Sequence, residues 1–480
     1  MNRIDVLPDD VLLRMFDFYV DVPVDMSPSD YDTRKPKIEV WQSLVHVCRR
    51  WRSLVLTSPR RLNLRLVCTP KTPVKDTLDI WPALPLIVAG DMSPTLSESI
   101  LSPGTDNIIA ALEQSNRVCQ VSLWSLLEFQ LEKVLATMQV PFPELTDLRL
   151  VFDAIFATDL DIPDSFLGGS APRLHSFSLD EIPFPGLPKL LLSATRLVKL
   201  HLTDIPYFGF ISSGAMVDPL SVLSCLEVLS IELRYPYPHL GWERQRLSPL
   251  NPTILPALRN LHFEGNSQYL EDLVSRIDTP QLRIFCITFF SQNNYDCPRL
   301  AQFINCTPKL RAPNQAHVRF DDRTASVKLL ARSRILEITI PSRESRRQLM
   351  SVPQICNSSL PPPSTVEDLY VEHQYSQLDW EEDAPDYTFW LEIFRPFTAV
   401  KNLYLSMEFA PDIVDALQDL IGARITEVFP SLQNIFLEGL YVEPSGHLQE
   451  SIWQFAGARQ QSGHPLAIFD WDNDSDIESM

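Results

Sequence analysis

The feature that most constrains this chain is a short apolar phrase that recurs along most of its length. The phrase has the form apolar-x-x-apolar-x-apolar, and its copies start on average about 28 residues apart. The twelve copies begin at Val118, Leu145, Leu174, Leu197, Leu226, Leu258, Leu282, Gln315 (a degraded copy), Ile335, Val366, Val400 and Leu432. The alternation within the phrase predicts a short strand with one buried face. The chain must therefore bury many such faces against a shared core.

The residues around the phrase indicate how the strands are connected. Several copies follow a proline by a few residues, as Leu145 follows Pro143, and stretches with helical spacing such as 126–138 and 413–421 separate the copies. Short strands that alternate with helices at a period of roughly 20–30 residues are typical of solenoid repeats. The phrase resembles the strand of leucine-rich repeats. This resemblance implies an irregular horseshoe, with parallel strands along the concave face and helices outside. An ordinary doubly wound α/β domain is the alternative.

Two amphipathic helices are predicted ahead of the repeats. In residues 7–16, Pro8 suits the first helical position, and Asp9 and Asp10 suit the positive end of the helix dipole. The apolar residues that follow them fall on one face. In residues 41–55, apolar side chains again recur at steps of three and four. Helices this short cannot bury such stripes alone, so they need each other, the rest of the chain or a partner.

These two segments resemble the ends of the F-box, a three-helix module. The matching residues are Leu7, Pro8, Leu12, Met15, Phe16, Val47, Cys48 and Trp51. The resemblance implies docking on the Skp adaptor, which bridges to a cullin in SCF-type ubiquitin ligases. The adaptor-binding positions that it implies are Leu7, Pro8, Val11, Leu12, Met15, Phe16, Val45, Cys48 and Trp51. The alternative is that the two stripes pack onto the rest of this chain.

Two departures from the F-box pattern concern its start and its middle. Asp10 stands where the family has Glu, and residues 21–39 form a longer connection than usual, with three prolines. The whole chain is similar to the expanded F-box families of mushroom-forming (basidiomycete) fungi, through phrases such as 79–86, 165–172 and 396–405. The expected organisation is an F-box at 1–66, a linker and capping segment at 67–105, a leucine-rich-repeat-like domain at 106–445, and a C-terminal segment at 446–480 that ends in an acidic, disordered tail.

The repeats also predict where a partner would bind. The fifth position of the phrase faces the concave side of the sheet, and the last three copies place Tyr370, Tyr404 and Phe436 there in one column. Glu372 and Glu438 lie in the neighbouring column. Aromatic columns on a rigid scaffold are typical interface anchors, so we expect a partner protein to dock on them, and a basic segment would suit the acids. The alternative is that the chain's own C-terminal tail covers these rings.

Composition excludes several classes of function. The formal net charge of −20 argues against nonspecific nucleic-acid binding, and no run of 18 apolar residues is long enough to span a membrane. The N-terminus lacks a signal-peptide core, so we expect a cytoplasmic or nuclear protein. The eight cysteines are scattered without a Cys-x-x-Cys pair, and no phosphate-binding glycine pattern or catalytic motif is found. We therefore expect no metal, no cofactor and no intrinsic catalysis.

The expected fold class is α/β, with an N-terminal helical F-box followed by the repeat horseshoe. The function that the resemblance implies is the substrate-recognition subunit of an SCF-type ubiquitin ligase, which binds the Skp adaptor through the F-box and a protein substrate through the repeats. The alternative is a non-catalytic interaction scaffold that does not take part in ubiquitination.

Overall fold

The structure is a computed structural model of the 480-residue chain, which divides into two compact units, Met1–Pro238 and His239–Met480. It describes residues 7–20, 41–59, 61–71, 73–81, 83–93, 103–153, 160–206, 209–234, 252–290, 295–342, 344–358, 360, 363–373, 388–422, 424–438 and 446–471. The F-box insert expected at 21–39 and the end of the tail, 472–480, lie outside these ranges.

Three short helices are described at the start of the first unit. These are α1 (Asp9–Val20), α3 (Trp41–Val45) and α4 (Arg49–Thr57). The Cys48 side chain caps α4, because its Sγ accepts a hydrogen bond from the Trp51 amide at 3.4 Å. The rings of Phe16 on α1 and Trp51 on α4 meet edge to face at a centroid distance of 4.7 Å. The helices therefore share a small core of their own.

Trp41 connects this helical core to the rest of the first unit. Its indole Nε1 donates to the Arg65 carbonyl at 3.0 Å, and its ring meets that of Trp81 at 5.1 Å. The Trp41 side chain is fully buried. The start of the expected apolar stripe at 41–55 thus packs onto the rest of this chain.

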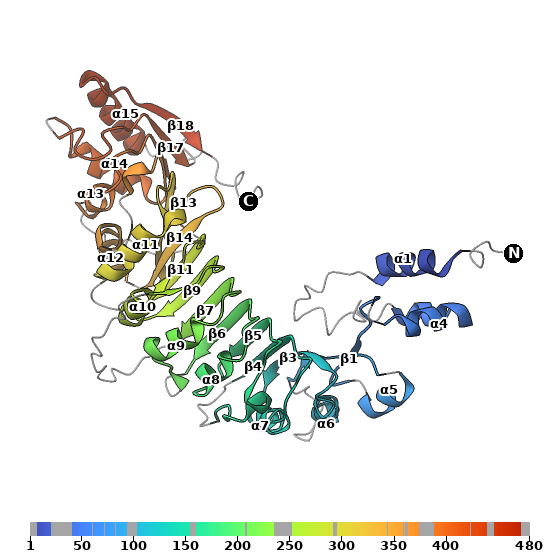
Figure 1. The fold of residues 1–480 in the computed structure, drawn as a ribbon. Coiled ribbons are helices and arrows are strands. Elements are labelled where there is room, and N and C mark those ends of the chain that lie inside the picture. The colour runs from blue at the N-terminus through green and yellow to red at the C-terminus, as the bar shows by residue number, and fades with distance from the viewer. Residues whose placement is uncertain are drawn as a thin grey trace. The chain divides into compact units, whose positions relative to one another are not determined.

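The rest of the first unit alternates strands with helices. Its strands are β1 (Leu66–Cys68), β2 (Leu86–Asp91), β3 (Val118–Leu126), β4 (Asp147–Phe152), β5 (Ser176–Asp180), β6 (Lys199–Ile205) and β7 (Val228–Leu233). They pair in parallel in this order. The helical segments are α5 (Val74–Ile80), α6 (Pro103–Leu112), α7 (Glu128–Thr137), η3 (Phe166–Gly169), α8 (Leu187–Leu191) and α9 (Ser213–Leu220). Figure 1 shows α6 to α9 along one side of the strands.

The second unit continues the alternation, with one irregularity. Its main sheet has the order β9 (Asn260–Gly265), β11 (Ile284–Phe289), β14 (Ile335–Pro341), β13 (Thr324–Leu330), β12 (Gln315–Phe320), β15 (Asp368–His373), β16 (Asn402–Leu405), β17 (Asn434–Glu438) and β18 (Ala467–Trp471). Strands β8 (Thr253–Ile254) and β10 (Ile277–Asp278) form a separate parallel pair. The helical segments are α10 (Ser267–Val274), α11 (Pro298–Cys306), η5 (Pro308–Leu310), α12 (Ser345–Ser358), η6 (Pro363–Thr365), α13 (Thr388–Phe394), α14 (Ala410–Gln418) and α15 (Gly446–Gln461).

The irregularity is β13, which runs antiparallel to both β12 and β14. A three-residue turn joins β12 to β13, and the Asp321 carboxylate accepts from the amides of Arg323 and Thr324 at 2.7 and 2.6 Å. A connection this short permits only an antiparallel neighbour. The expectation of parallel strands throughout is therefore wrong for this part of the second unit.

Away from β13, the apolar phrase behaves as predicted. In the copy that begins at Val366, the side chains of Val366, Leu369 and Val371 are fully buried, while Tyr370 between them is half-buried. Each fully buried side chain of this kind contributes on the order of 1.5–3 kcal/mol. The sheets also include β1 and β2 before residue 106 and β18 after residue 445, beyond both ends of the range expected for the repeats.

Candidate functional site

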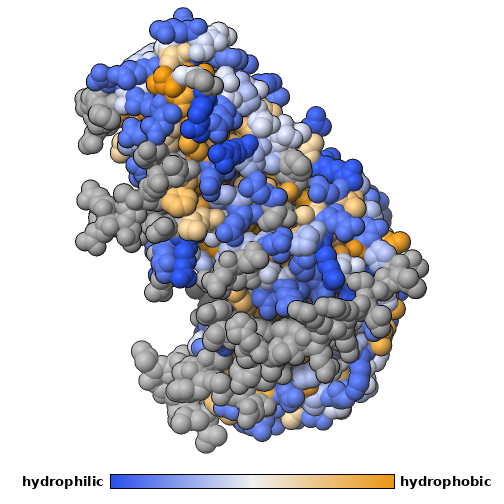
Figure 2. All heavy atoms as spheres, turned by 90° about the vertical axis from the view of Figure 1, so that its left-hand side faces the viewer, coloured by the Kyte–Doolittle hydropathy of each residue, from blue (hydrophilic) through white to orange (hydrophobic). Residues whose placement is uncertain are grey.

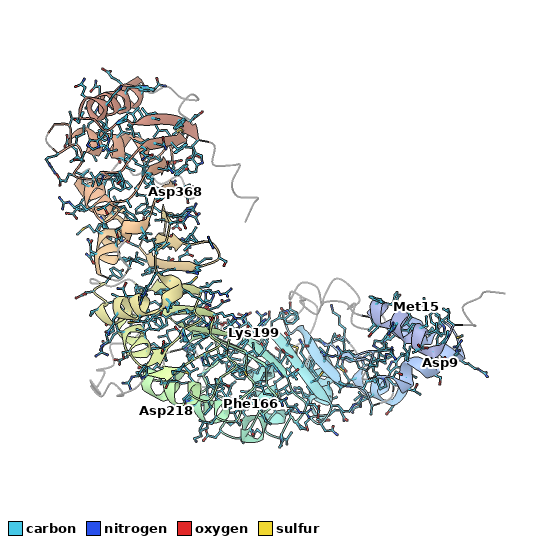
Figure 3. All side chains as sticks on the ribbon, turned by 45° about the horizontal axis from the view of Figure 1, so that its top comes forward. Asp9, Met15, Phe166, Lys199, Asp218 and Asp368 are labelled. Atoms are coloured by element: carbon cyan, nitrogen blue, oxygen red, sulfur yellow. The ribbon has the colours of Figure 1, made fainter. Side chains whose placement is uncertain are left out.

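The first candidate surface is an exposed apolar face on α1. Val11, Met15 and Phe18 lie at spacings of three and four residues, which places them on one side of the helix. Their exposed fractions are 37, 48 and 87%. Figure 3 labels Met15 on this helix. Exposed apolar side chains that gather on one face mark protein-binding surfaces.

The structure divides the nine residues for which adaptor binding is expected. Leu12, Phe16 and Val45 are buried within the first unit, and Leu7 and Trp51 are half-buried. Four more of these residues are exposed: Pro8, Val11, Met15 and Cys48. The motif therefore combines interior residues with surface residues.

Three further exposed apolar residues near this face lie outside the expected set. Phe18 and Tyr19 follow Met15 on α1, and Val47, which precedes α4, is 58% exposed. The F-box match includes Val47 but neither Phe18 nor Tyr19. The helical spacing of Phe18 relative to Val11 and Met15 is the signal that could have found it.

Arg50 joins the start of α1 to α4. Its Nη2 donates to the Leu7 carbonyl at 2.5 Å and to the Asp9 carboxylate at 2.6 Å, and its Nε donates to the same carboxylate at 3.1 Å. Because both charged side chains are substantially exposed, the ion pair is worth at most about 1 kcal/mol. Its main effect is to fix the position of the exposed face of α1 relative to α4.

The second candidate surface is a row of stacked rings in the second unit, here called the aromatic ladder. It consists of His317, Tyr370, Tyr404, Phe436 and Phe469, on β12, β15, β16, β17 and β18. Successive ring centroids are 4.3, 4.1, 4.4 and 5.1 Å apart, and the planes differ by 3 to 21°. The strand register places each ring opposite the next. The predicted column of Tyr370, Tyr404 and Phe436 is thus brought together.

The ladder includes two rings that the sequence did not predict there. The phrase at Gln315 places Arg319 in the same column as Tyr370, whereas the pairing of β12 with β15 places His317 opposite Tyr370. At Ile335 the strand pairing differs from the phrase by two residues in the same way. Glu337, and not Thr339, lies opposite Cys286. Phe469 lies in the C-terminal segment at 446–480, beyond the range in which repeats are expected. No copy of the phrase marks that segment.

A polar cluster lies beside the ladder, centred on Glu372. Its carboxylate contacts His317 Nδ1 at 3.1 Å and accepts a hydrogen bond from Arg319 Nε. Burial alone would raise the pKa of Glu372, but the hydrogen bonds and charges of His317 and Arg319 outweigh it and lower the pKa. The carboxylate is therefore held ionised, and it fixes the His317 ring at one end of the ladder.

A chain of side-chain hydrogen bonds runs parallel to the ladder on its other side. Asn434 donates to Asn402 at 2.7 Å, and Asn402 donates to Asp368 at 2.6 Å. Figure 3 labels Asp368 in the second unit. The second predicted acid, Glu438, accepts from the Met407 amide at 3.3 Å. The expected acids Glu372 and Glu438 thus lie on the same flank of the ladder, and Asp368 lies on the opposite flank.

Trp471, the last residue of β18, packs on the ladder. Its ring meets those of Tyr404 and Tyr370 edge to face, at centroid distances of 5.5 and 6.0 Å. This contact is of the kind expected if the chain's own C-terminal segment covers the aromatic column. Both sequence-based alternatives for this column therefore have a physical basis in the described residues.

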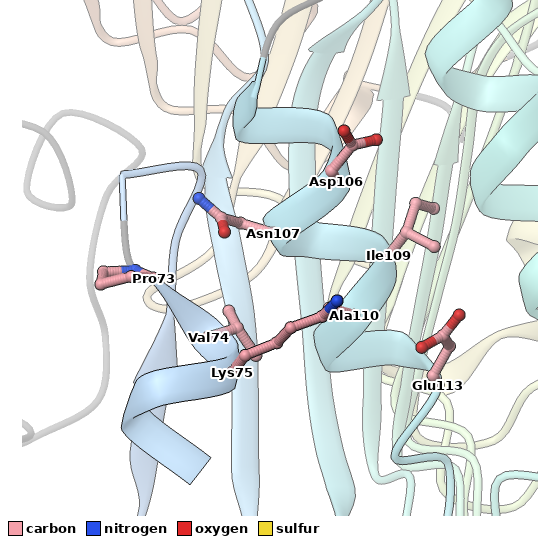
Figure 4. A pocket seen from close by; sticks show the side chains of 8 residues that line it. All are labelled: Pro73, Val74, Lys75, Asp106, Asn107, Ile109, Ala110 and Glu113. Carbon is pink, nitrogen blue, oxygen red and sulfur yellow. The ribbon is translucent and has the colours of Figure 1, made fainter. Parts of the chain in front are cut away.

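The remaining hollows are less distinctive. A groove of about 560 Å³ lies between α5 and α6 and is shown in Figure 4. Its lining residues are Pro73, Val74, Lys75, Asp106, Asn107, Ile109, Ala110 and Glu113. A second hollow, of about 410 Å³, is lined mainly by α12 and α13. Figure 2 shows that the helix-covered side of the second unit is mostly hydrophilic, with scattered apolar residues. Neither hollow concentrates reactive groups.

Within the described ranges, no group of three or more His, Cys, Asp or Glu side chains is arranged to hold a metal ion. Among the helices that the structure describes, none is long and apolar enough to cross a membrane.

Comparisons with known proteins add little to this geometry. No protein-family model matches the chain, and no curated protein matches it significantly. Among solved structures, the leucine-rich repeat-containing protein LegL7 of Legionella pneumophila is similar at 15% sequence identity, over 81% of this chain and 97% of that one. The TM-score is 0.27, so the description of the fold rests on the strand pairing above. That pairing defines a mixed α/β protein with mostly parallel sheets.

Proposed function

We propose that this protein is the substrate-recognition subunit of an SCF-type ubiquitin ligase. In this proposal, the exposed face of α1 binds the Skp adaptor and, through it, a cullin, while the repeats bind a protein substrate. The observation that carries the proposal is the exposed line of Val11, Met15 and Phe18 on a helix whose opposite side is buried. Ligase chemistry would belong to the assembled complex, so the proposal assigns this chain no catalytic residue and no cofactor.

The exposed face of α1 can supply part of the free energy of a specific contact. Complete burial of Val11, Met15 or Phe18 would contribute on the order of 1.5–3 kcal/mol each, and less where the side chain is already partly covered. Association costs several kcal/mol in lost freedom, so these three residues need help from neighbours. Tyr19, next to Phe18 on α1, and Val47, just before α4, are also exposed and would add to the buried area.

The aromatic ladder is the proposed substrate-binding surface. Tyr370, Tyr404 and Phe436 are half-buried rings held in register by the sheet. Because the strands fix the spacing of these rings, little conformational entropy is lost when a partner binds them. Glu372 and Glu438 on one flank favour a basic segment in the partner.

A non-catalytic interaction scaffold is the second candidate. The absence of a matching F-box family model favours it, and so does the burial of Leu12, Phe16 and Val45, which leaves only part of the motif on the surface. Such a scaffold would use the same two surfaces without ubiquitin transfer.

Co-purification separates the two candidates. The full-length protein is isolated from an extract of its own cells and tested by immunoblot for the Skp adaptor and cullin. We expect both to be present, and to be lost in a Met15→Asp variant, which places a charge on the exposed face without touching the core. Leu192→Asp is the matched control, because Leu192 is 53% exposed and lies at the end of α8. If the wild-type protein brings down neither component, the scaffold is favoured.

A further inference from the structure

Trp471 contacts rings on strands that are not adjacent to its own. Its backbone pairs with Glu438 on β17, the adjacent strand. Its indole nevertheless packs on Tyr404 of β16 and Tyr370 of β15, the next two strands along. The side chain therefore lies across the edges of the stacked rings, where a bound partner would make contact.

Two buried polar groups in the row of Trp471 have no hydrogen-bond partner. The indole Nε1 is buried and makes no hydrogen bond, and the same holds for the Ser406 hydroxyl, whose residue is 1% exposed. The pairing of Leu405 with Leu437 and of Glu438 with Trp471 places Ser406 in the same row as Trp471. A buried polar group without a partner costs free energy. This cost opposes the gain from the edge-to-face ring contacts, so Trp471 can be displaced by an occupant that satisfies these polar groups.

The charges beside the ladder indicate what would replace Trp471. Glu372 and Glu438 lie on one flank and Asp368 lies on the other. Arg319 pairs with Glu372 and offsets its charge, so the remaining negative charge of this region lies on Glu438 and Asp368. An occupant with its own positive charges would meet these acids, and an aromatic side chain would reproduce the contacts that Trp471 makes.

We propose that Trp471 is an intramolecular cap on the aromatic ladder, and that its competitor is a partner segment with an aromatic side chain flanked by Lys or Arg. This inference rests on the proposed role of the ladder as the substrate-binding surface. It adds that the surface is occupied by the chain itself until such a segment arrives.

Peptide binding to the full-length protein tests the cap. The probe is a fluorescein-labelled Lys-Lys-Trp-Lys-Lys peptide, with Lys-Lys-Ala-Lys-Lys and Glu-Glu-Trp-Glu-Glu as comparison peptides, and binding is followed by fluorescence anisotropy. We expect Trp471→Ala to bind the first peptide about tenfold more tightly than the wild-type protein, which corresponds to about 1.4 kcal/mol. The two comparison peptides should bind weakly or not at all.

Trp453→Ala is the matched control, because Trp453 is 58% exposed on α15 and should leave the affinity unchanged. Far-UV circular dichroism and Tm confirm that each variant folds. If Trp471→Ala does not fold, Trp471→Thr also removes the indole but keeps a residue that favours strands. Equal affinity in the wild-type and Trp471 variants would overturn the cap, as would equal binding of the alanine peptide or no binding at all.

A Tyr370→Ala/Tyr404→Ala variant separates the failure of the cap from failure of the proposed binding surface. If this variant loses the peptide while Trp471→Ala leaves affinity unchanged, the cap is wrong and the ladder remains a binding surface. If the double variant binds as tightly as the wild-type protein, the peptide binds elsewhere and both ideas about the ladder are wrong. Adaptor co-purification tests the role of α1 independently.

Discussion

The ring of Tyr404 stacks on that of Tyr370 with their centroids 4.1 Å apart and their planes 7° apart. The two residues are paired in register on parallel strands, which are normally about 4.8 Å apart. A shift of one residue in this register would turn one ring to the helix side of the sheet. The stack therefore shows that the strands of successive repeats are aligned. It also forms a surface to which several repeats contribute.

Removal of the central rings should abolish substrate binding and leave adaptor binding intact. We expect this of the triple variant Tyr370→Ala/Tyr404→Ala/Phe436→Ala, because the three rings form the middle of the ladder and lie in the second unit, whereas α1 lies in the first. The measurement is recovery of substrate and of adaptor in parallel pull-downs. Trp453→Ala with Ile421→Ala, two exposed apolar residues of the same unit, is the control. Undiminished recovery of substrate by the triple variant would rule out this surface.

Glu372 should make stability depend on pH. The contacts with His317 and Arg319 lower the folded-state pKa of Glu372 below its ordinary value of 4.5. A carboxyl group with a lowered folded-state pKa adds stability above the unfolded-state value, and this stability is lost as the pH falls through the folded-state value. We therefore expect Glu372→Gln to be less stable than the wild-type protein by about 2 kcal/mol at neutral pH. The difference should shrink below pH 4.5.

Urea unfolding at a series of pH values measures this difference. Glu113→Gln is the control, because Glu113 is exposed on the surface of the first unit. A deficit for Glu372→Gln that stays constant as the pH falls would show that the carboxylate charge does not stabilise the fold.

Arg459 should be required for the packing of the last repeat. It is fully buried on α15, and its guanidinium donates to the carbonyls of Ile425, Phe429 and Leu432 at 3.1, 3.4 and 3.3 Å. Burial lowers the pKa of Arg459. The planar guanidinium can satisfy three carbonyls at once, and an ammonium group cannot match that geometry.

We expect Arg459→Lys to lose about 2 kcal/mol and Arg459→Ala about 3–5 kcal/mol of unfolding free energy. Arg424→Lys, an exposed substitution of the same type, should change stability by less than about 0.5 kcal/mol. Chemical denaturation measures all three. If Arg459→Lys is as stable as the wild-type protein, the carbonyl contacts are not what holds α15 in place.

The sequence predicts the ordinary repeats well because buried and exposed side chains alternate along each strand. Leu369 and Val371 on β15 are an example: both are apolar in the phrase and both are fully buried in the sheet. The same pattern predicts which side of the strand Tyr370 occupies. It does not depend on which strand lies next to β15, and so it holds even where the order of strands changes.

The order of strands around β13 depends instead on turn chemistry. Asp321 binds the amides at the turn after β12, and this reverses the chain within three residues. The apolar phrase is insensitive to such a reversal, and at β12 it places Arg319 in the column that the strand pairing gives to His317. On α1, the F-box motif places Leu12 and Met15 in one functional class, whereas packing buries the first and exposes the second. A motif alone does not separate these roles.

The turn at Gly168 and Gly169 offers a test of backbone strain in the first unit. Both residues have positive φ, at 67 and 74°, where a side chain is strained. A Cβ on Gly168 would lie 2.7 Å from the Pro141 ring and 2.9 Å from the Pro141 nitrogen, whereas a Cβ on Gly169 would have no atom closer than the Asp164 carbonyl at 3.8 Å. The two glycines thus share the strain and differ in the clash.

We expect Gly169→Ala to cost about 1–2 kcal/mol of unfolding free energy from strain alone. Gly168→Ala should cost about 1–3 kcal/mol more, because the Pro141 backbone must shift to make room. Urea denaturation of the two variants gives the difference directly, and each variant serves as the control for the other. Equal losses would mean that the contact with Pro141 relaxes without cost. Peptide binding at the aromatic ladder should be unchanged in both, since the turn lies in the first unit and the ladder in the second.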